Sequence, residues 1–70
     1  MPKLPTISGE ELIKILVKKV QYSVHRQKGS HVILTHPSKK PITVPLHKEI
    51  KIGTLKGIIR IAELDEKELR

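Results

Sequence analysis

The stretch Gly29-Ser30-His31 holds the side chain best suited to acid–base chemistry. It lies between two runs with the composition of β-strands, Tyr22–Arg26 and Ser30–His36. A glycine favours a turn at this point because it adopts positive φ angles that other residues resist. Imidazole is the side chain whose unperturbed pKa lies closest to neutral pH, so it can both accept and donate a proton in water. His31 is therefore the candidate general acid/base, and Gly29 and Ser30 form the turn that presents it.

The apolar pattern of the two strands predicts the register of a hairpin. The predicted pairs are Val24 with Val32, Tyr22 with Leu34 and Arg26 with Ser30. This register leaves Gln27-Lys28-Gly29 as a three-residue loop, and such loops usually end in a glycine with positive φ. It also sets His25 opposite His31 on the face away from the core, with Cβ atoms about 4.5–5.5 Å apart. His25 is therefore one candidate for a second proton-transfer group.

The other elements follow from capping patterns and periodicity. Ser8 and Glu11 form a capping box that opens an amphipathic helix, which runs to about Lys19 or Val20. Ile42–Val44 form a third strand, which Pro45 ends because proline lacks the donor that a ladder needs.

A second helix follows a basic connector. It opens at Gly53-Thr54, and its apolar residues have helical spacing at Leu55, Ile58, Ile59 and Ala62. Asp65 and Glu68 form a second capping pattern, which predicts a final turn or short helix. The order predicts an α+β fold, α-β-β-β-α, as one small domain over residues 1–70. Two helices would cover one face of a three-stranded antiparallel sheet.

The composition excludes several classes of protein. The 70 residues include no cysteine, so no disulfide or thiolate is available, and no apolar run approaches the roughly 20 residues of a membrane span. No signal peptide is recognisable at the start, which predicts a cytoplasmic protein. Tyr22 is the one aromatic residue, which argues against recognition of bases by ring stacking. Abundant Lys, Ile and Glu without Asn or Cys is typical of a thermophile.

The charge distribution predicts a polyanionic partner. The formal net charge is +7, and residues 12–62 contain eleven lysines and arginines but only one acid, Glu49. This pattern fits an RNA phosphate backbone, although a solvated surface or an acidic protein partner fits it too. The candidate phosphate-binding residues are Arg26, Lys28, Lys39, Lys40 and Lys48.

The histidines are poorly arranged for a metal site, because no carboxylate is placed near them by the sequence. Ser30 cannot serve His31 as a nucleophile, since neighbours on a strand point to opposite faces. Cleavage of RNA without metal or other cofactor requires fewer groups from the protein, because the substrate's own 2′-OH is the nucleophile. His31 would be the base, and His25 or His47 a second group. Arg26, Lys28 and Lys48 would stabilise the transition state.

The sequence resembles the HicA-type toxins of prokaryotic toxin–antitoxin systems, which are mRNA interferases. The matching elements are Ser8-Gly9-Glu10-Glu11, Arg26-Gln27-Lys28-Gly29-Ser30-His31, His36-Pro37, Val44-Pro45-Leu46-His47 and Gly53-Thr54-Leu55. The resemblance implies a fold like that of a double-stranded-RNA-binding domain, a ribonuclease activity on mRNA and His31 as the catalytic residue. It also implies a HicB-type antitoxin as inhibitor, and we expect the free toxin to be monomeric.

Two positions depart from the family pattern. Members often have glycine where this chain has Gln21 and near Glu63, and both are positions at which a helix stops. His25 is not part of the family pattern. Two other functions stay open at this point, a non-catalytic RNA-binding module and a subunit that only docks an acidic protein.

Overall fold

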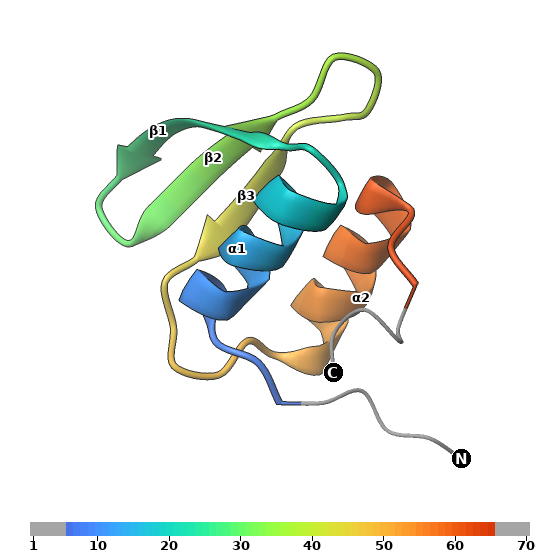
Figure 1. Cartoon of the computed structure of the whole chain (residues 1–70). Helices are drawn as coiled ribbons and strands as arrows, with labels where there is room; N and C mark the ends of the chain where they lie inside the picture. Colours follow the sequence, from blue (N-terminus) through green and yellow to red (C-terminus); the bar gives the residue numbers. More distant parts are fainter. Residues whose placement is uncertain (1–5, 66–70) are drawn as a thin grey trace.

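A computed structural model describes residues 6–65 and has the predicted α-β-β-β-α order. The elements are α1 (Gly9–Lys19), β1 (Ser23–Lys28), β2 (His31–Thr35), β3 (Ile42–Pro45) and α2 (Ile52–Ala62). The strands form an antiparallel sheet in the order β1-β2-β3, and both helices lie on one side of it (Figure 1). The predicted fold is therefore confirmed. The capping pattern that ends at Glu68 lies outside the described residues.

The first helix begins as its sequence predicts. The Glu11 N–H donates to the Ser8 Oγ at 3.2 Å, and the Ser8 N–H donates to the Glu11 carboxylate at 3.4 Å. This confirms the capping box.

Within residues 6–65, neither helix is long and apolar enough to cross a membrane.

The core lies between the helices and one face of the sheet. It contains Val32, Leu34, Ile42 and Val44 from the strands, Leu12 and Leu16 from α1, and Leu55, Ile58 and Ala62 from α2. Tyr22 is 1% exposed, and its hydroxyl donates to the Lys40 carbonyl oxygen at 2.9 Å, which ties the β2–β3 loop to the start of β1. The His36 ring packs on Tyr22 with centroids 4.9 Å apart, so His36 has a structural position.

Replacing Tyr22 with phenylalanine should lower the free energy of unfolding by about 1 kcal/mol at neutral pH, because the hydrogen bond to Lys40 is lost. Burial, and secondarily the Glu63 carboxylate, raise the pKa of the Tyr22 phenol. The unfolded chain therefore ionises this phenol first, near pH 10, and the wild type loses stability relative to the variant as the pH rises above that value. Urea unfolding of both proteins at neutral pH and at about pH 10.5 measures the difference. The same difference at both pH values would contradict the prediction.

Each helix is followed within two residues by a residue with left-handed backbone conformation. These residues are Gln21, with φ 64°, and Glu63, with φ 56°. After α2, the Glu63 N–H donates to the Arg60 carbonyl and the Leu64 N–H donates to the Ile59 carbonyl, which is the pattern of a Schellman motif. Among the described residues, Gln21 and Glu63 are thus the two positions other than glycine where the backbone strains a side chain.

Replacing Gln21 with glycine should raise the free energy of unfolding by about 1 kcal/mol, because a left-handed backbone costs a residue with a Cβ about that much. Chemical denaturation of the two proteins measures the gain. Gln21→Ala is the matched control, since it removes the side chain but keeps the Cβ, and it should give no such gain. Equal stability of the glycine and alanine variants would refute the explanation.

The β1–β2 hairpin differs from the predicted one. The structure pairs Lys28 with His31 and closes the turn with the two residues Gly29-Ser30, so the predicted register and three-residue loop are wrong. Arg26 pairs with Ile33, three positions away from its predicted partner. A displacement by an odd number of residues turns a side chain to the other face of the sheet. Arg26 therefore lies on the face away from the core.

A β-bulge at His25 accounts for the rest of the difference. The register passes from the pair of Val24 with Leu34 to the pair of Arg26 with Ile33 and skips His25. The inserted residue breaks the two-residue period of the strand, so Val24 and Arg26 face opposite sides. Val24 was expected to belong to the core, but it is 53% exposed at the edge of the sheet.

The strand boundaries shift accordingly. β1 begins after Tyr22 and runs to Lys28, whereas the sequence predicted Tyr22–Arg26. β2 covers His31–Thr35, which is shorter at both ends than predicted. β3 includes Pro45, whose partner in the ladder is His31.

Candidate active site

The turn before His31 depends on Gly29. Its φ is 60°, as the sequence predicted, and a Cβ at this position would meet no atom within 4 Å. Glycine is therefore needed for its backbone angle and not for space. A positive φ at the first of two central residues is the pattern of a type II′ turn, which suits the twist of a hairpin. The Gln27 side-chain amide donates to the Gly29 carbonyl at 3.0 Å and supports this turn.

His31 lies on the face of the sheet opposite the helices, which we call the open face. The residues of the open face are Ser23, Arg26, Lys28, His31, Ile33, Thr35, Thr43 and Pro45. Thr43 shares this face because it pairs with Ile33, two residues from His31. The His31 side chain is exposed, and the three strands contain no aspartate or glutamate. A phosphate at this histidine would meet no repelling carboxylate from the sheet.

His31 has a partner directly across from it on each neighbouring strand. The partner on β1 is Lys28, and the partner on β3 is Pro45. Side chains in this relation have Cβ atoms about 4.5–5.5 Å apart. An ammonium group therefore stands where the sequence placed the His25 imidazole. The pairing places a proton-transfer group and a cation next to each other on an exposed surface.

The two candidates for a second proton-transfer group have different positions. His25, in the bulge, lies three residues from Lys28 along β1, which is about 10 Å of strand. The predicted contact between His25 and His31 is therefore wrong. His47 follows β3 by two residues, and the chain before it is held at the turn, where the Leu46 N–H donates to the Ser30 carbonyl at 2.7 Å. The structure thus brings His47 toward the end of the sheet that carries His31.

Gly9 fixes the segment that carries His47. Its N–H donates to the His47 carbonyl at 2.9 Å, and a Cβ at Gly9 would overlap the Pro45 carbonyl oxygen. The start of α1 can approach the end of β3 this closely only with glycine. Sequence reasoning missed this role, although a glycine directly after a capping serine was a visible signal.

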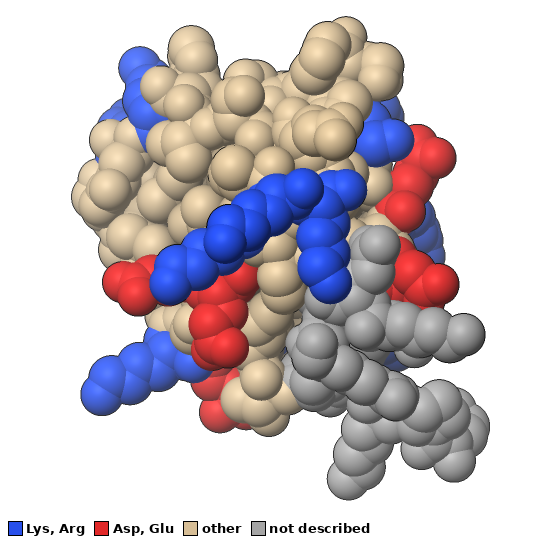
Figure 2. Space-filling view, in the orientation of Figure 1, with Lys and Arg blue, Asp and Glu red and all other residues tan. Residues whose placement is uncertain are grey.

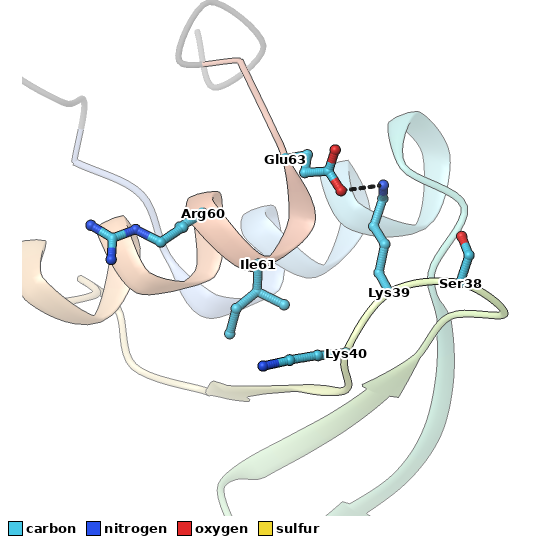
Figure 3. Close-up of a pocket in the computed structure, with 6 residues that line it drawn as sticks. All are labelled: Ser38, Lys39, Lys40, Arg60, Ile61 and Glu63. Carbon is cyan, nitrogen blue, oxygen red and sulfur yellow. Dashed lines mark hydrogen bonds and ion pairs between the residues drawn. The ribbon is translucent and has the colours of Figure 1, made fainter.

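The predicted phosphate-binding residues do not form one cluster. Arg26 and Lys28 share the open face, and Lys48 lines a small hollow with Ser8, Glu10, Leu46 and His47 beside the start of α1. Lys39 and Lys40 lie in the β2–β3 loop, beyond the end of β2 that is farther from His31. They line a hollow with residues from the end of α2, where the Lys39 ammonium contacts the Glu63 carboxylate at 3.2 Å (Figure 3).

Basic side chains are also plentiful away from the sheet. Figure 2 shows that lysine and arginine gather over the side covered by the helices, with acidic side chains next to them. The total charge therefore does not locate a binding site. The absence of acids distinguishes the strands from the helix-covered side.

The described part of the chain offers no group of three or more His, Cys, Asp or Glu side chains that could hold a metal ion. Proton transfer and electrostatic stabilisation are the chemistry that the side chains around His31 can perform. Both would act on a ligand that lies across the open face.

A family model described as the HicA toxin of bacterial toxin–antitoxin systems matches residues 9–64, which include both helices, all three strands and the turn before His31. Neither the curated proteins nor the solved structures contain a match to the chain. Because the family model spans most of the 70 residues, the chain belongs to the HicA family, the toxins of bacterial toxin–antitoxin systems.

Proposed function

We propose that this toxin is a metal-independent endoribonuclease that cleaves mRNA, with His31 as the general acid/base. The observation that carries the proposal is the pairing of an exposed His31 with Lys28 on strands without acidic residues. RNA contains its own nucleophile, so the protein needs to supply only proton transfer and positive charge. Membership in a toxin family agrees with an activity that harms the cell unless it is controlled.

The reaction is an internal transesterification. A general base takes the proton of the 2′-OH, and the 2′-oxygen attacks the neighbouring phosphorus while the bond to the 5′-oxygen breaks. A general acid returns a proton to that 5′-oxygen, so the products are a 2′,3′-cyclic phosphate and a 5′-hydroxyl. His31 performs one of the two proton transfers. His47 is the better candidate for the other, because the bulge carries His25 away from His31.

The RNA backbone would lie along the open face. Lys28 contacts the phosphate at the cleaved bond, Arg26 lies one row further along the same face, and Lys48 contacts the chain beyond the turn. Lys39 and Lys40, at the other end of the sheet, would contact a separate part of the RNA. In this arrangement each cation contributes to binding, whereas only those beside His31 contribute to the reaction.

The toxin's cognate antitoxin would be of the HicB type and would inhibit by covering the open face. This surface is cationic and free of acids, so an antitoxin segment with carboxylates complements it. The same segment would exclude RNA from His31.

Incubation of the purified protein with a long mRNA in EDTA tests the function. We expect discrete fragments whose 5′-hydroxyl ends accept phosphate from a polynucleotide kinase without prior phosphatase treatment. The α-β-β-β-α order also fits a module that binds RNA without cleaving it. That alternative predicts salt-dependent binding and intact RNA, and this outcome would overturn the proposal.

A further inference from the structure

The open face has a second row of side chains next to the row of Lys28, His31 and Pro45. In this row Arg26 stands opposite Ile33, and Ile33 stands opposite Thr43. The two rows are two residues apart along β2, which is about 7 Å. Directly opposed side chains have Cβ atoms about 4.5–5.5 Å apart, so a guanidinium, an aliphatic side chain and a hydroxyl lie in a line across the sheet.

Ile33 has no part in the core. Its neighbours Val32 and Leu34 belong to the core, but Ile33 is absent both from it and from the partly buried apolar residues that pack against it. Its partner in β1 is a cation because the bulge at His25 turns Arg26 to the open face. An aliphatic side chain between a cation and a hydroxyl is thus presented on the same surface as His31.

We propose that Arg26, Ile33 and Thr43 form a nucleobase subsite beside the cleaved bond and that it prefers guanine. A base has an apolar face, which suits Ile33, and a hydrogen-bonding edge. The Arg26 guanidinium carries donors only, in a fork that matches the two adjacent acceptors O6 and N7 of guanine. Adenine offers one acceptor and one donor on that edge. The Thr43 hydroxyl can donate or accept, so it adds contact without choosing between bases.

The subsite would replace aromatic stacking. Sheets that bind RNA commonly stack bases on aromatic rings, but the one tyrosine of this chain is in the core. In the row of Ile33, an aliphatic side chain and a guanidinium plane are the groups that can lie against a base. The inference rests on the proposed ribonuclease function, because it places the subsite relative to the phosphate at His31.

DNA oligonucleotides that contain a single ribonucleotide test the proposal, since they offer a single bond with a neighbouring 2′-OH. The base is varied in turn on each side of that bond. At one of the two positions we expect guanine to raise kcat/KM about tenfold or more above the pyrimidines. Arg26→Lys keeps the charge but loses the fork, and it should reduce this preference to about twofold while cleavage continues. Lys28→Ala should slow cleavage of all the oligonucleotides by the same factor and leave the preference intact.

The same oligonucleotides can be bound to the His31→Ala variant, so that the preference is measured without cleavage. Equal rates and equal affinities for the four bases would overturn the subsite, as would an unchanged preference in Arg26→Lys. Failure of the proposed function gives a different result, because the wild type would then leave every oligonucleotide intact. A guanine preference in binding would still be expected in that case if the row recognises a base.

Discussion

Replacing His31 with alanine should abolish most RNA cleavage and leave the protein folded. The side chain is exposed on the open face and belongs neither to the core nor to the residues packed against it, so its loss creates no cavity. Loss of a positioned general acid or base commonly lowers a rate by about 10²–10⁴-fold. Fragment yield from a long mRNA, measured in EDTA over time, gives the ratio of the variant's rate to that of the wild type.

His25→Ala is the matched control for this variant. Both changes remove an exposed imidazole from neighbouring strands, but His25 lies in the bulge, about 10 Å along β1 from the residue that pairs with His31. The control should therefore keep nearly the full rate. A His31→Ala protein that cleaves at the wild-type rate in EDTA would show that the mechanism is wrong, and equal losses in both variants would point to an effect on the fold.

The features that could be predicted from the sequence are those set by residues close together in the chain. The capping box needs only Ser8 and Glu11, three residues apart, and it is present. The positive φ of Gly29 follows from the preference of tight turns for glycine, and it is confirmed although the loop is shorter than predicted. Local chemistry decides each of these features, so tertiary packing does not alter them.

The register of the hairpin could not be predicted in this way. Pairing Tyr22 with Leu34 would satisfy the apolar pattern, but Tyr22 instead enters the core before β1 begins and donates to the Lys40 carbonyl. That contact joins residues 18 positions apart, and strand alternation contains no information about it. The bulge then changes the face of Arg26, which is why the sequence placed the wrong partner opposite His31.

The positions of the cations could not be predicted from the sequence either. A run of lysines and arginines through the middle of the chain predicts a single phosphate-binding surface. The strand β2 separates two groups, because His31 is at its first residue and the loop with Lys39 and Lys40 follows its last. Net charge per segment therefore does not place the cations, because the position of each one depends on the topology.

Replacing Lys28 with methionine should lower kcat by about 10²-fold, with a much smaller effect on KM. Lys28 stands directly across from His31, so its ammonium can contact the non-bridging oxygens of a phosphate held at that histidine. Charge on these oxygens increases in the transition state, and removal of one such stabilising group costs about 10²–10³-fold in other enzymes. Methionine keeps the length and most of the volume of the side chain. Steady-state cleavage of a short RNA measures kcat and KM separately.

Lys28→Arg tests whether kcat depends on a positive charge at this position or on the ammonium group itself. It restores a cation at the same place and should recover most of kcat. Arg26→Lys is the second control, since Arg26 lies on the same face of β1 but is paired with Ile33. It should change the base preference and leave kcat for the best base within a few-fold of the wild type. If Lys28→Met raised KM and left kcat unchanged, Lys28 would be a simple phosphate contact. The positive charge that stabilises the transition state would then have to come from another residue near His31.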